Sequence, residues 1–162
     1  MLALQTISRQ TFHETFAAVN SEANMKQYLE ESLSLEKLDT ELNNPESSFY
    51  FVKDGDEIIG YLKLNMGDAQ TESQDKIALE IERIYVLKTY HGKEIGKLLF
   101  DKAMEEAQRR QSPYLWLGVW EENHRAISFY RKQGFEPFDT HLFHLGEDVQ
   151  TDILMKINLN KP

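Results

Sequence analysis

The chain has 162 residues, and its 18 basic and 27 acidic residues give a formal net charge of −9. With 41% hydrophobic and 28% charged residues it has the composition of a globular domain, which excludes a disordered or fibrous chain. The acidic balance argues against a nucleic-acid partner, and the lack of cysteine excludes disulfides, thiolate nucleophiles and cysteine-ligated metals.

Nothing in the sequence indicates a membrane segment or a secretory signal. No stretch approaches 18 apolar residues, and the first residues lack a basic region followed by an apolar one. We therefore expect a cytoplasmic protein without a membrane partner. Because no repeat or flexible linker divides the chain, residues 1–162 are predicted to form a single domain.

The first half of the chain predicts helices followed by a strand hairpin. Phe12, Phe16 and Val19 recur at helical spacing, whereas Asp54-Gly55 is a hairpin turn signal between two strand-like runs. In chain order, the predicted elements are an edge strand at 1–7, helices within 9–42, paired strands at 48–54 and 57–66, a long surface loop at 67–76 and a third strand at 77–86.

In the third strand, simple alternation places Glu80, Glu82 and Ile84 on one face and Leu79, Ile81 and Tyr85 on the other.

The second half alternates helices and strands. A long helix is predicted to follow the Gly-containing loop and to end near Arg110, with an apolar stripe at Ile95, Leu98, Leu99, Ala103 and Ala107. The remaining elements are a strand at 114–120, a helix at 123–133 capped by Gly134, and strands near 135–145 and 151–158. This order predicts an α/β protein with a mixed sheet.

The junction from Val86 to Lys97 predicts an anion site. A strand there leads through a Gly-containing loop into a helix, whose first N–H groups are unpaired and lie at the positive end of the helix dipole. The P-loop spacing does not fit, because Gly92 and Gly96 are one residue too close and Leu98 stands where a hydroxyl is needed. The G-x-G-x-x-G dinucleotide fingerprint is absent as well.

Two segments carry a family resemblance. Val86 followed by His91-Gly92-Lys93-Glu94-Ile95-Gly96 is similar to the acetyl-CoA loop of the GCN5-related N-acetyltransferases. Further on, the family pattern N-x-x-A-I-x-F-Y-x-K-x-G-F is matched by Asn123, Ala126, Ile127, Phe129, Tyr130, Lys132, Gly134 and Phe135. The chain also resembles the PaiA-type polyamine acetyltransferase branch, through residues 50–65 and 82–86.

The resemblance implies a single-domain fold with a mixed, mostly antiparallel twisted sheet flanked by helices. It implies that acetyl-CoA is the co-substrate and that transfer to a small amine is direct, within a ternary complex. The cofactor-binding residues that it implies are Ile84, Tyr85, Val86, His91, Gly92, Lys93, Glu94, Ile95, Gly96, Lys97, Asn123, Tyr130 and Lys132.

Two residues depart from the family pattern in the loop. His91 replaces the usual Gln or Arg, and Glu94 replaces the usual middle Gly. A carboxylate near a pyrophosphate is repulsive unless its side chain turns to solvent. These departures keep open a second hypothesis, an acyl-CoA-binding regulatory module with weak activity.

Tyr130 is the candidate general acid for the departing thiolate. Its spacing from Asn123 and Ile127 puts the three on one helix face, along which the cofactor is expected to lie. Without the resemblance, the preferred interpretation is that Tyr130 is a core aromatic and Asn123 a helix N-cap.

Glu80 and Glu82 are the candidate general bases. Two carboxylates on one face of an apolar strand are costly to bury, so they are predicted to border a cleft; the alternative is a pair of solvated strand residues, with Arg83 as an ion-pair partner. The Val86 N–H is the predicted oxyanion donor, because the family's strand splays at this point.

The acceptor is predicted to be a polyamine, since several ammonium groups need carboxylates to attract them. Amino acids and protein N-termini stay open as acceptors, and so does a homodimer. His13, His124, His141 and His144 show no ligand spacing with one another, so no metal site is predicted.

Overall fold

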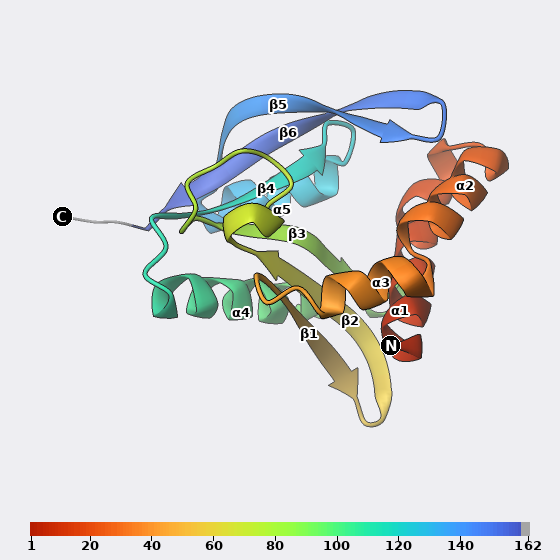
Figure 1. Ribbon diagram of the computed structural model, residues 1–162, viewed down its shortest axis with the longest axis horizontal. Helices are drawn as coiled ribbons and strands as arrows, with labels where there is room; N and C mark the ends of the chain where they lie inside the picture. The colour runs from red at the N-terminus through yellow and green to blue at the C-terminus, as the bar shows by residue number, and fades with distance from the viewer. Residues whose placement is uncertain (160–162) are drawn as a thin grey trace.

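The computed structural model describes residues 1–159, whose strands form one six-stranded sheet (Figure 1). The strand order is β1-β2-β3-β4-β6-β5; β3 and β4 are parallel and all other neighbours are antiparallel. The predicted mixed, mostly antiparallel sheet is confirmed. The strands are β1 Ser47–Asp54, β2 Glu57–Asn65, β3 Leu79–Val86, β4 Tyr114–Trp120, β5 Glu136–Leu145 and β6 Asp148–Asn158.

The N-terminal segment is a helix, so the strand predicted at 1–7 is wrong. Helix α1 (Leu2–Phe16) buries Leu4, Ile7, Phe12 and Phe16, which recur every three to five residues. Residues 1–7 contain only the first two of these buried positions. Two positions are too few to distinguish the repeat of a helix from that of a strand. The other helices are α2 Glu22–Ser32, α3 Leu35–Leu42, α4 Ile95–Arg109 and α5 His124–Gln133, with short 3₁₀ turns η1 Ala17–Val19, η2 Gly67–Ala69 and η3 Lys88–Tyr90.

Helices cover both faces of the sheet (Figure 1). On one face α4 and α5 bury Leu99, Phe100, Ala103 and Tyr130 against the strands, and on the other α1, α2 and α3 share a second core. Leu98 does not belong to the predicted apolar stripe of α4, because its side chain is exposed. Within the described residues, no helix combines the length and apolar character needed to cross a bilayer.

A β-bulge in β3 reverses the predicted face assignment for the second half of that strand. Lys63 pairs with Arg83 but Leu64 pairs with Ile81, so Glu82 is an extra residue opposite β2. One extra residue switches every later side chain to the other face. Ile84 therefore joins Ile81 in the core under α4, and Tyr85 joins the core under α1.

Beyond the bulge, β3 and β4 separate. Their pairing covers only Leu79–Ile81 against Leu115–Leu117, after which the two halves of the sheet diverge toward α1, α2 and α3 (Figure 1). The diverging ends leave space between the strands.

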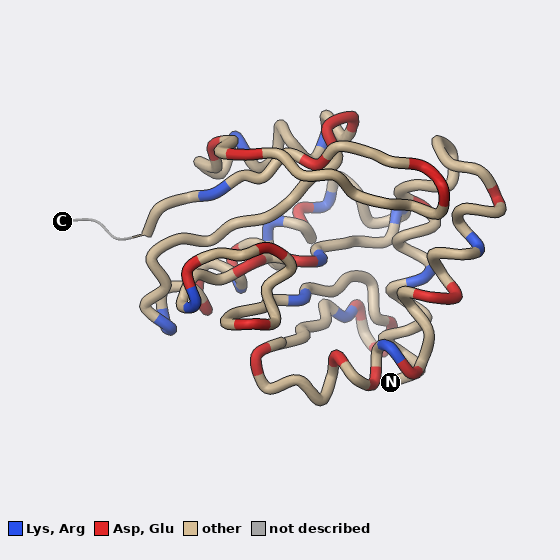
Figure 2. The backbone as a smooth tube through the Cα atoms, turned by 45° about the horizontal axis from the view of Figure 1, so that its top comes forward, with Lys and Arg blue, Asp and Glu red and all other residues tan. Residues whose placement is uncertain are grey.

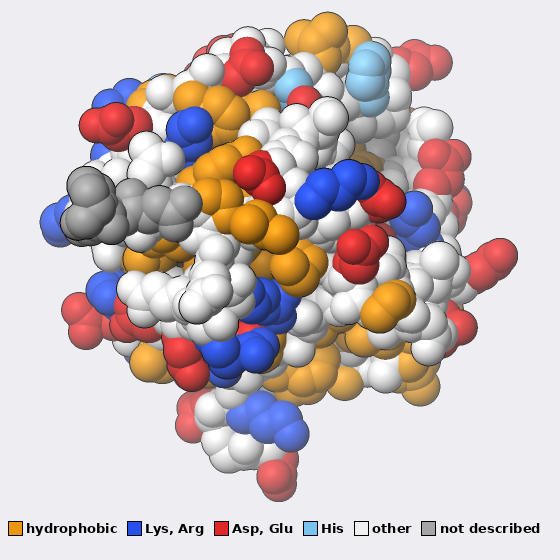
Figure 3. Space-filling view, turned by 60° about the vertical axis from the view of Figure 1, so that its left-hand side comes forward, with side chains coloured by type: hydrophobic (Ala, Val, Ile, Leu, Met, Phe, Trp, Pro, Cys, Tyr) orange, Lys and Arg blue, Asp and Glu red, His pale blue; other side chains and the backbone are white. Residues whose placement is uncertain are grey.

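Acidic residues are spread along the whole chain, with basic ones interspersed among them (Figure 2). The face in Figure 3 shows the same mixture, with a strip of hydrophobic side chains between charged groups. The net charge by itself therefore does not locate an acceptor site.

Candidate active site

A cavity of about 870 Å³ opens where β3 and β4 diverge. Its walls come from both sides of the sheet: α1 and α2, the loop after β2, β3, the loop before α4, β4, α5 and the β5–β6 hairpin. A cavity that crosses the sheet admits two molecules from opposite sides, which is the arrangement that group transfer within a ternary complex requires.

The loop at the N-terminus of α4 forms one end of this cavity. Glu94 is the N-cap of α4 and has left-handed backbone angles, φ 62° and ψ 21°, which glycine adopts without steric cost. Its side chain makes no capping hydrogen bond to α4. The first N–H groups of the helix therefore remain available to an anion, beside Gly96 and Lys97 in the cavity wall.

The Val86 peptide faces this space. Leu87 donates its N–H to the carbonyl oxygen of Ile59 at 2.8 Å, so the preceding pair, Val86 with Gly60, is a pair without mutual hydrogen bonds. The N–H and the C=O of Val86 consequently point away from β2 and toward the gap between β3 and β4.

His91 is fixed between Val86 and Arg125. Its Nε2 atom lies 2.9 Å from the Val86 carbonyl oxygen, and its Nδ1 atom lies 2.8 Å from Arg125 Nη1. Because a carbonyl only accepts and a guanidinium only donates, Nε2 donates to Val86 and Nδ1 accepts from Arg125. The contact joins the loop before α4 to the first turn of α5.

Helix α5 presents a different face from the one predicted. Asn123 is its N-cap and accepts from the Ala126 N–H at 3.2 Å. Asn123, Ala126 and Tyr130 line the cavity, whereas Ile127 packs in the core beneath the sheet. The prediction that Asn123, Ile127 and Tyr130 share the cavity-facing side of the helix is therefore wrong for Ile127.

Tyr130 is both a core aromatic and a wall residue. It packs against Phe129 and Phe135 and is only 7% exposed. Its hydroxyl has no hydrogen-bond partner among residues 1–159. Burial raises the pKa of the phenol, so Tyr130 holds its proton at neutral pH.

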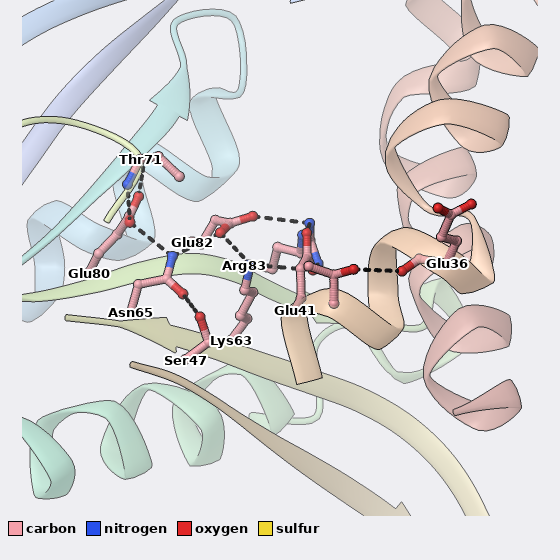
Figure 4. Close-up of polar contacts among 10 residues, drawn as sticks. Glu36, Glu41, Ser47, Lys63, Asn65, Thr71, Glu80, Glu82 and Arg83 are labelled. Atoms are coloured by element: carbon pink, nitrogen blue, oxygen red, sulfur yellow. Dashed lines mark hydrogen bonds and ion pairs between the residues drawn. The ribbon is translucent and has the colours of Figure 1, made fainter. Parts of the chain in front are cut away.

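Glu80 is buried under the loop that follows β2 (Figure 4). Its Oε1 accepts from the Thr71 N–H at 2.8 Å and from Asn65 Nδ2 at 3.0 Å, and its Oε2 accepts from the Thr71 hydroxyl. Burial raises the pKa of this carboxyl, and the hydrogen bonds from Thr71 and Asn65 offset only part of that effect. Among the described residues, no cation forms an ion pair with Glu80. A buried carboxyl without a cation is suited to exchange a proton.

Glu82 belongs to a buried ion-pair network (Figure 4). Lys63 Nζ lies 2.7 Å from Glu82 and 3.3 Å from Glu41, and Arg83 contacts both carboxylates at 3.1 and 2.8 Å. Burial raises the pKa of the Glu82 carboxyl, but the charges of Arg83 and Lys63 outweigh burial and lower it below its ordinary value. The pairing of Arg83 with one of the two strand carboxylates, which belonged to the alternative interpretation, is present with Glu82, but Glu82 is not a solvated residue.

The structure brings nearly all of the predicted site residues to the cavity. Lys93 is the exception, because its Nζ lies over the Tyr90 ring and not in the cavity wall. The cavity-lining residues among the predictions are Glu80, Glu82, Ile84, Tyr85, Val86, His91, Gly92, Glu94, Ile95, Gly96, Lys97, Asn123, Tyr130 and Lys132.

Sequence reasoning missed Asn65, Thr71 and Arg125. Asn65 could have been found, because it ends an apolar strand and a buried amide there needs polar partners. Arg125 lies inside the second motif, two residues after Asn123, but no pattern predicted its contact with His91. No pattern marked Thr71. Among the described residues, no group of three or more His, Asp or Glu side chains is arranged to hold a metal ion.

Comparisons with known proteins place the chain in one family. The family model described as the acetyltransferase (GNAT) family matches residues 9–135. An uncharacterized N-acetyltransferase of Lactobacillus delbrueckii subsp. lactis is 46% identical over 150 residues, covering 93% of this chain and 87% of that protein.

Two comparisons concern Thermoplasma acidophilum. Its spermidine N(1)-acetyltransferase is 27% identical over 138 residues, covering 83% of this chain and 81% of that protein. The crystal structure of its PaiA N-acetyltransferase in complex with coenzyme A superposes with a TM-score of 0.79 at 25% identity, covering 97% of this chain and 91% of that one.

Proposed function

The chain belongs to the GNAT acetyltransferase family and is an acetyl-CoA-dependent N-acetyltransferase, and we propose that its acceptor is a polyamine. The observation that carries this proposal is Glu80, a buried carboxylate that lines the cavity and has no cation partner among the described residues. Such a group attracts an ammonium and then removes its proton. Similarity to the spermidine acetyltransferase of Thermoplasma acidophilum supports the same acceptor class.

The end of the cavity nearest α4 fits the cofactor. The α4 N-terminus offers free N–H groups, and Lys97, Arg125 and Lys132 add positive charge to the same walls. Acetyl-CoA supplies an acetyl group that is already activated as a thioester. The Val86 N–H points into the gap, where it would stabilise negative charge on the acetyl oxygen, and His91 keeps that peptide oriented through the Val86 carbonyl.

We assign the general base to Glu80 and not to Glu82. Glu80 has a raised pKa, which brings its proton affinity closer to that of an amine. Glu82 is held by Lys63 and Arg83, so its negative charge is already neutralised and its lowered pKa makes it a weaker base. Glu80 acts directly or through one water on the ammonium of the acceptor.

Tyr130 is assigned as the general acid. Its phenol is protonated at neutral pH, lies in the wall formed by α5, and is free of competing hydrogen bonds among the described residues. A proton donor at this position would neutralise the thiolate as it leaves.

The test is thiol release on mixing the protein with acetyl-CoA and a panel of amines: spermidine, spermine, a monoamine, neutral amino acids and a peptide N-terminus. We expect the polyamines to be turned over, with a kcat/KM that falls with ionic strength more steeply than that of the monoamine, because salt screens attraction to the carboxylates. Turnover of amino acids or peptides alone would reject the polyamine assignment. CoA binding without thiol release for any amine would instead indicate the regulatory module.

A further inference from the structure

Three polar residues meet on the cavity wall that faces away from α4. His141 on β5 has its Nδ1 3.3 Å from Glu72 Oε2 and its Nε2 3.5 Å from Asp152 Oδ2 on β6. All three line the cavity and none is fully exposed. We call Glu72, His141 and Asp152 the distal cluster. Burial raises the pKa of the Asp152 carboxyl, and His141 opposes that effect.

The loop that carries Glu72 is tied to the sheet on both sides of that residue. Trp116 Nε1 donates to Gln70 Oε1 at 2.7 Å, and the Tyr114 hydroxyl donates to Gln74 Oε1 at 2.6 Å. Both tyrosine and tryptophan belong to β4, so the strand itself sets the position of the loop. The loop on either side of Glu72 is thus held against β4, and the Glu72 side chain is only partly exposed.

Gly118 connects the distal cluster to the reacting centre. It lies directly after Leu117, the last β4 residue paired with β3, and it is exposed to the cavity between the buried Leu117 and Val119. A Cβ atom at Gly118 would lie 3.6 Å from Asp152 Oδ2. The Asp152 carboxylate therefore reaches back over β4 to the place where the sheet opens.

Besides the distal cluster, the cavity wall of the described chain contains an unpartnered hydroxyl and several aromatic rings. Tyr130, which is only 7% exposed, lines the cavity with a hydroxyl that has no partner among the described residues. Aromatic rings form part of the wall beside the cluster: Tyr28 and Phe143 have centroids 6.0 Å apart, as do Phe16 and Trp120. Aromatic faces pack well against methylene chains and attract ammonium groups.

The cations that line the cavity lie elsewhere or are already paired. Arg83, on β3, is bound to Glu41 and Glu82. The others belong to the loop after β3 and to α4 and α5: Lys88, Lys97, Arg125 and Lys132. A carboxylate on the acceptor would meet Glu72 and Asp152, which have His141 between them but no lysine or arginine partner in the described wall. An ammonium would instead meet two carboxylates.

We propose that Glu72 and Asp152 bind a second cationic group of the acceptor, with His141 setting the spacing between them and the aromatic wall holding the carbon chain. This inference rests on the proposed polyamine function and names the residues that would select an acceptor with two separated amines. It makes the distal cluster a specificity site that takes no part in the chemical step.

The experiment measures binding and turnover separately. The Kd of spermidine, 1,3-diaminopropane and propylamine is measured by calorimetry on the CoA-saturated protein, and kcat and KM are measured with acetyl-CoA. The variants are Asp152→Asn and Glu72→Gln, which remove charge with little change in shape, and the control is Glu147→Gln, an acidic residue of the same hairpin that does not line the cavity. Melting curves establish that each variant is folded.

We expect both variants to weaken spermidine and diaminopropane binding by about tenfold and to leave propylamine unchanged, because a charge-assisted contact is lost only for the second amine. At saturating spermidine, kcat should stay within about twofold, because the reacting centre is untouched. Equal losses for the monoamine and the diamine, or no loss at all, would overturn the inference.

The two proposals fail in different ways. Tight spermidine binding that depends on Asp152 and Glu72, without turnover, would reject the polyamine reaction and keep the binding site. Turnover of spermidine that is insensitive to both variants would reject the site and keep the reaction. If spermidine neither binds nor reacts, both are wrong.

Discussion

The Thr71 backbone N–H and hydroxyl both donate to the Glu80 carboxylate, so a loop residue sets the proton affinity of a strand residue. These hydrogen bonds favour the charged form and oppose the rise in the Glu80 pKa that burial causes. The contact gives the loop after β2 a direct influence on the candidate general base.

Removing the Thr71 hydroxyl should therefore move the pH dependence of the reaction. In Thr71→Val one hydrogen bond to the Glu80 carboxylate is lost, its pKa rises further, and the acidic limb of the kcat/KM profile shifts to higher pH. The measurement is kcat/KM against pH, with Thr140→Val, an exposed threonine on β5, as the matched control. An acidic limb that stays in place would show that Glu80 is not the titrating base.

The catalytic contribution of the Tyr130 hydroxyl can be tested separately from the packing of its ring. Tyr130→Phe keeps the contacts with Phe129 and Phe135 and deletes only the proton donor. We expect kcat to fall by roughly 10²-fold, at the lower end for general acid catalysis, with little change in the Kd of CoA. Single-turnover rates should be compared, so that product release does not hide the effect. If they are unchanged, Tyr130 is a packing residue only.

Glu94 stands in a backbone conformation that suits glycine, at the point where an anion is expected. Glu94→Gly should raise the free energy of unfolding by about 1 kcal/mol, because the left-handed conformation then costs nothing, and should tighten CoA binding by removing a nearby negative charge. Glu94→Gln separates the two effects, since it removes the charge and keeps the strain. Its CoA affinity should rise without a gain in stability, and a loss of affinity would show that the carboxylate helps binding.

Lys63 is only 4% exposed and Arg83 8%, so the ion-pair network around Glu82 has little access to water. Lys63→Met leaves Glu41 and Glu82 to share Arg83, and we expect a loss of about 3 kcal/mol from the free energy of unfolding. Lys76→Met, which removes an exposed partner of Asp68, should change nothing measurable.

The same network has a defined pH dependence. In the folded protein the pKa of Glu82 lies below the ordinary value of a glutamate, so the stability that it contributes is present above that ordinary pKa and is lost as the pH falls through the lowered pKa. The difference between the wild type and Lys63→Met, measured by urea unfolding, should therefore shrink in acid. A difference that is constant from neutral pH into acid would exclude Glu82 as its source.

Much of the fold could be predicted from turn residues and from motifs that are continuous in the sequence. The Asp54-Gly55 hairpin, the helix cap at Gly134 and the strand–loop–helix junction from Val86 to Lys97 each involve neighbours in the chain, so short patterns suffice to predict them. The family motifs also indicated residues that line one end of the cavity, the proposed cofactor end, because that end is built from two continuous segments. The N-terminal helix was missed, since its first turns by themselves carry too few apolar residues to reveal their period.

Only the tertiary structure decided the roles of the acidic residues. Glu80 and Glu82 look alike in sequence, yet Glu80 is covered by Thr71 and lacks a cation partner in the described chain, whereas Glu82 is paired with Lys63, a residue of the neighbouring strand, and with Arg83. The bulge that separates them depends on the register with β2, and the meeting of His141 with Glu72 and Asp152 depends on a loop that folds back over the sheet. Register and loop docking are fixed by contacts between distant segments, so a linear pattern does not contain them.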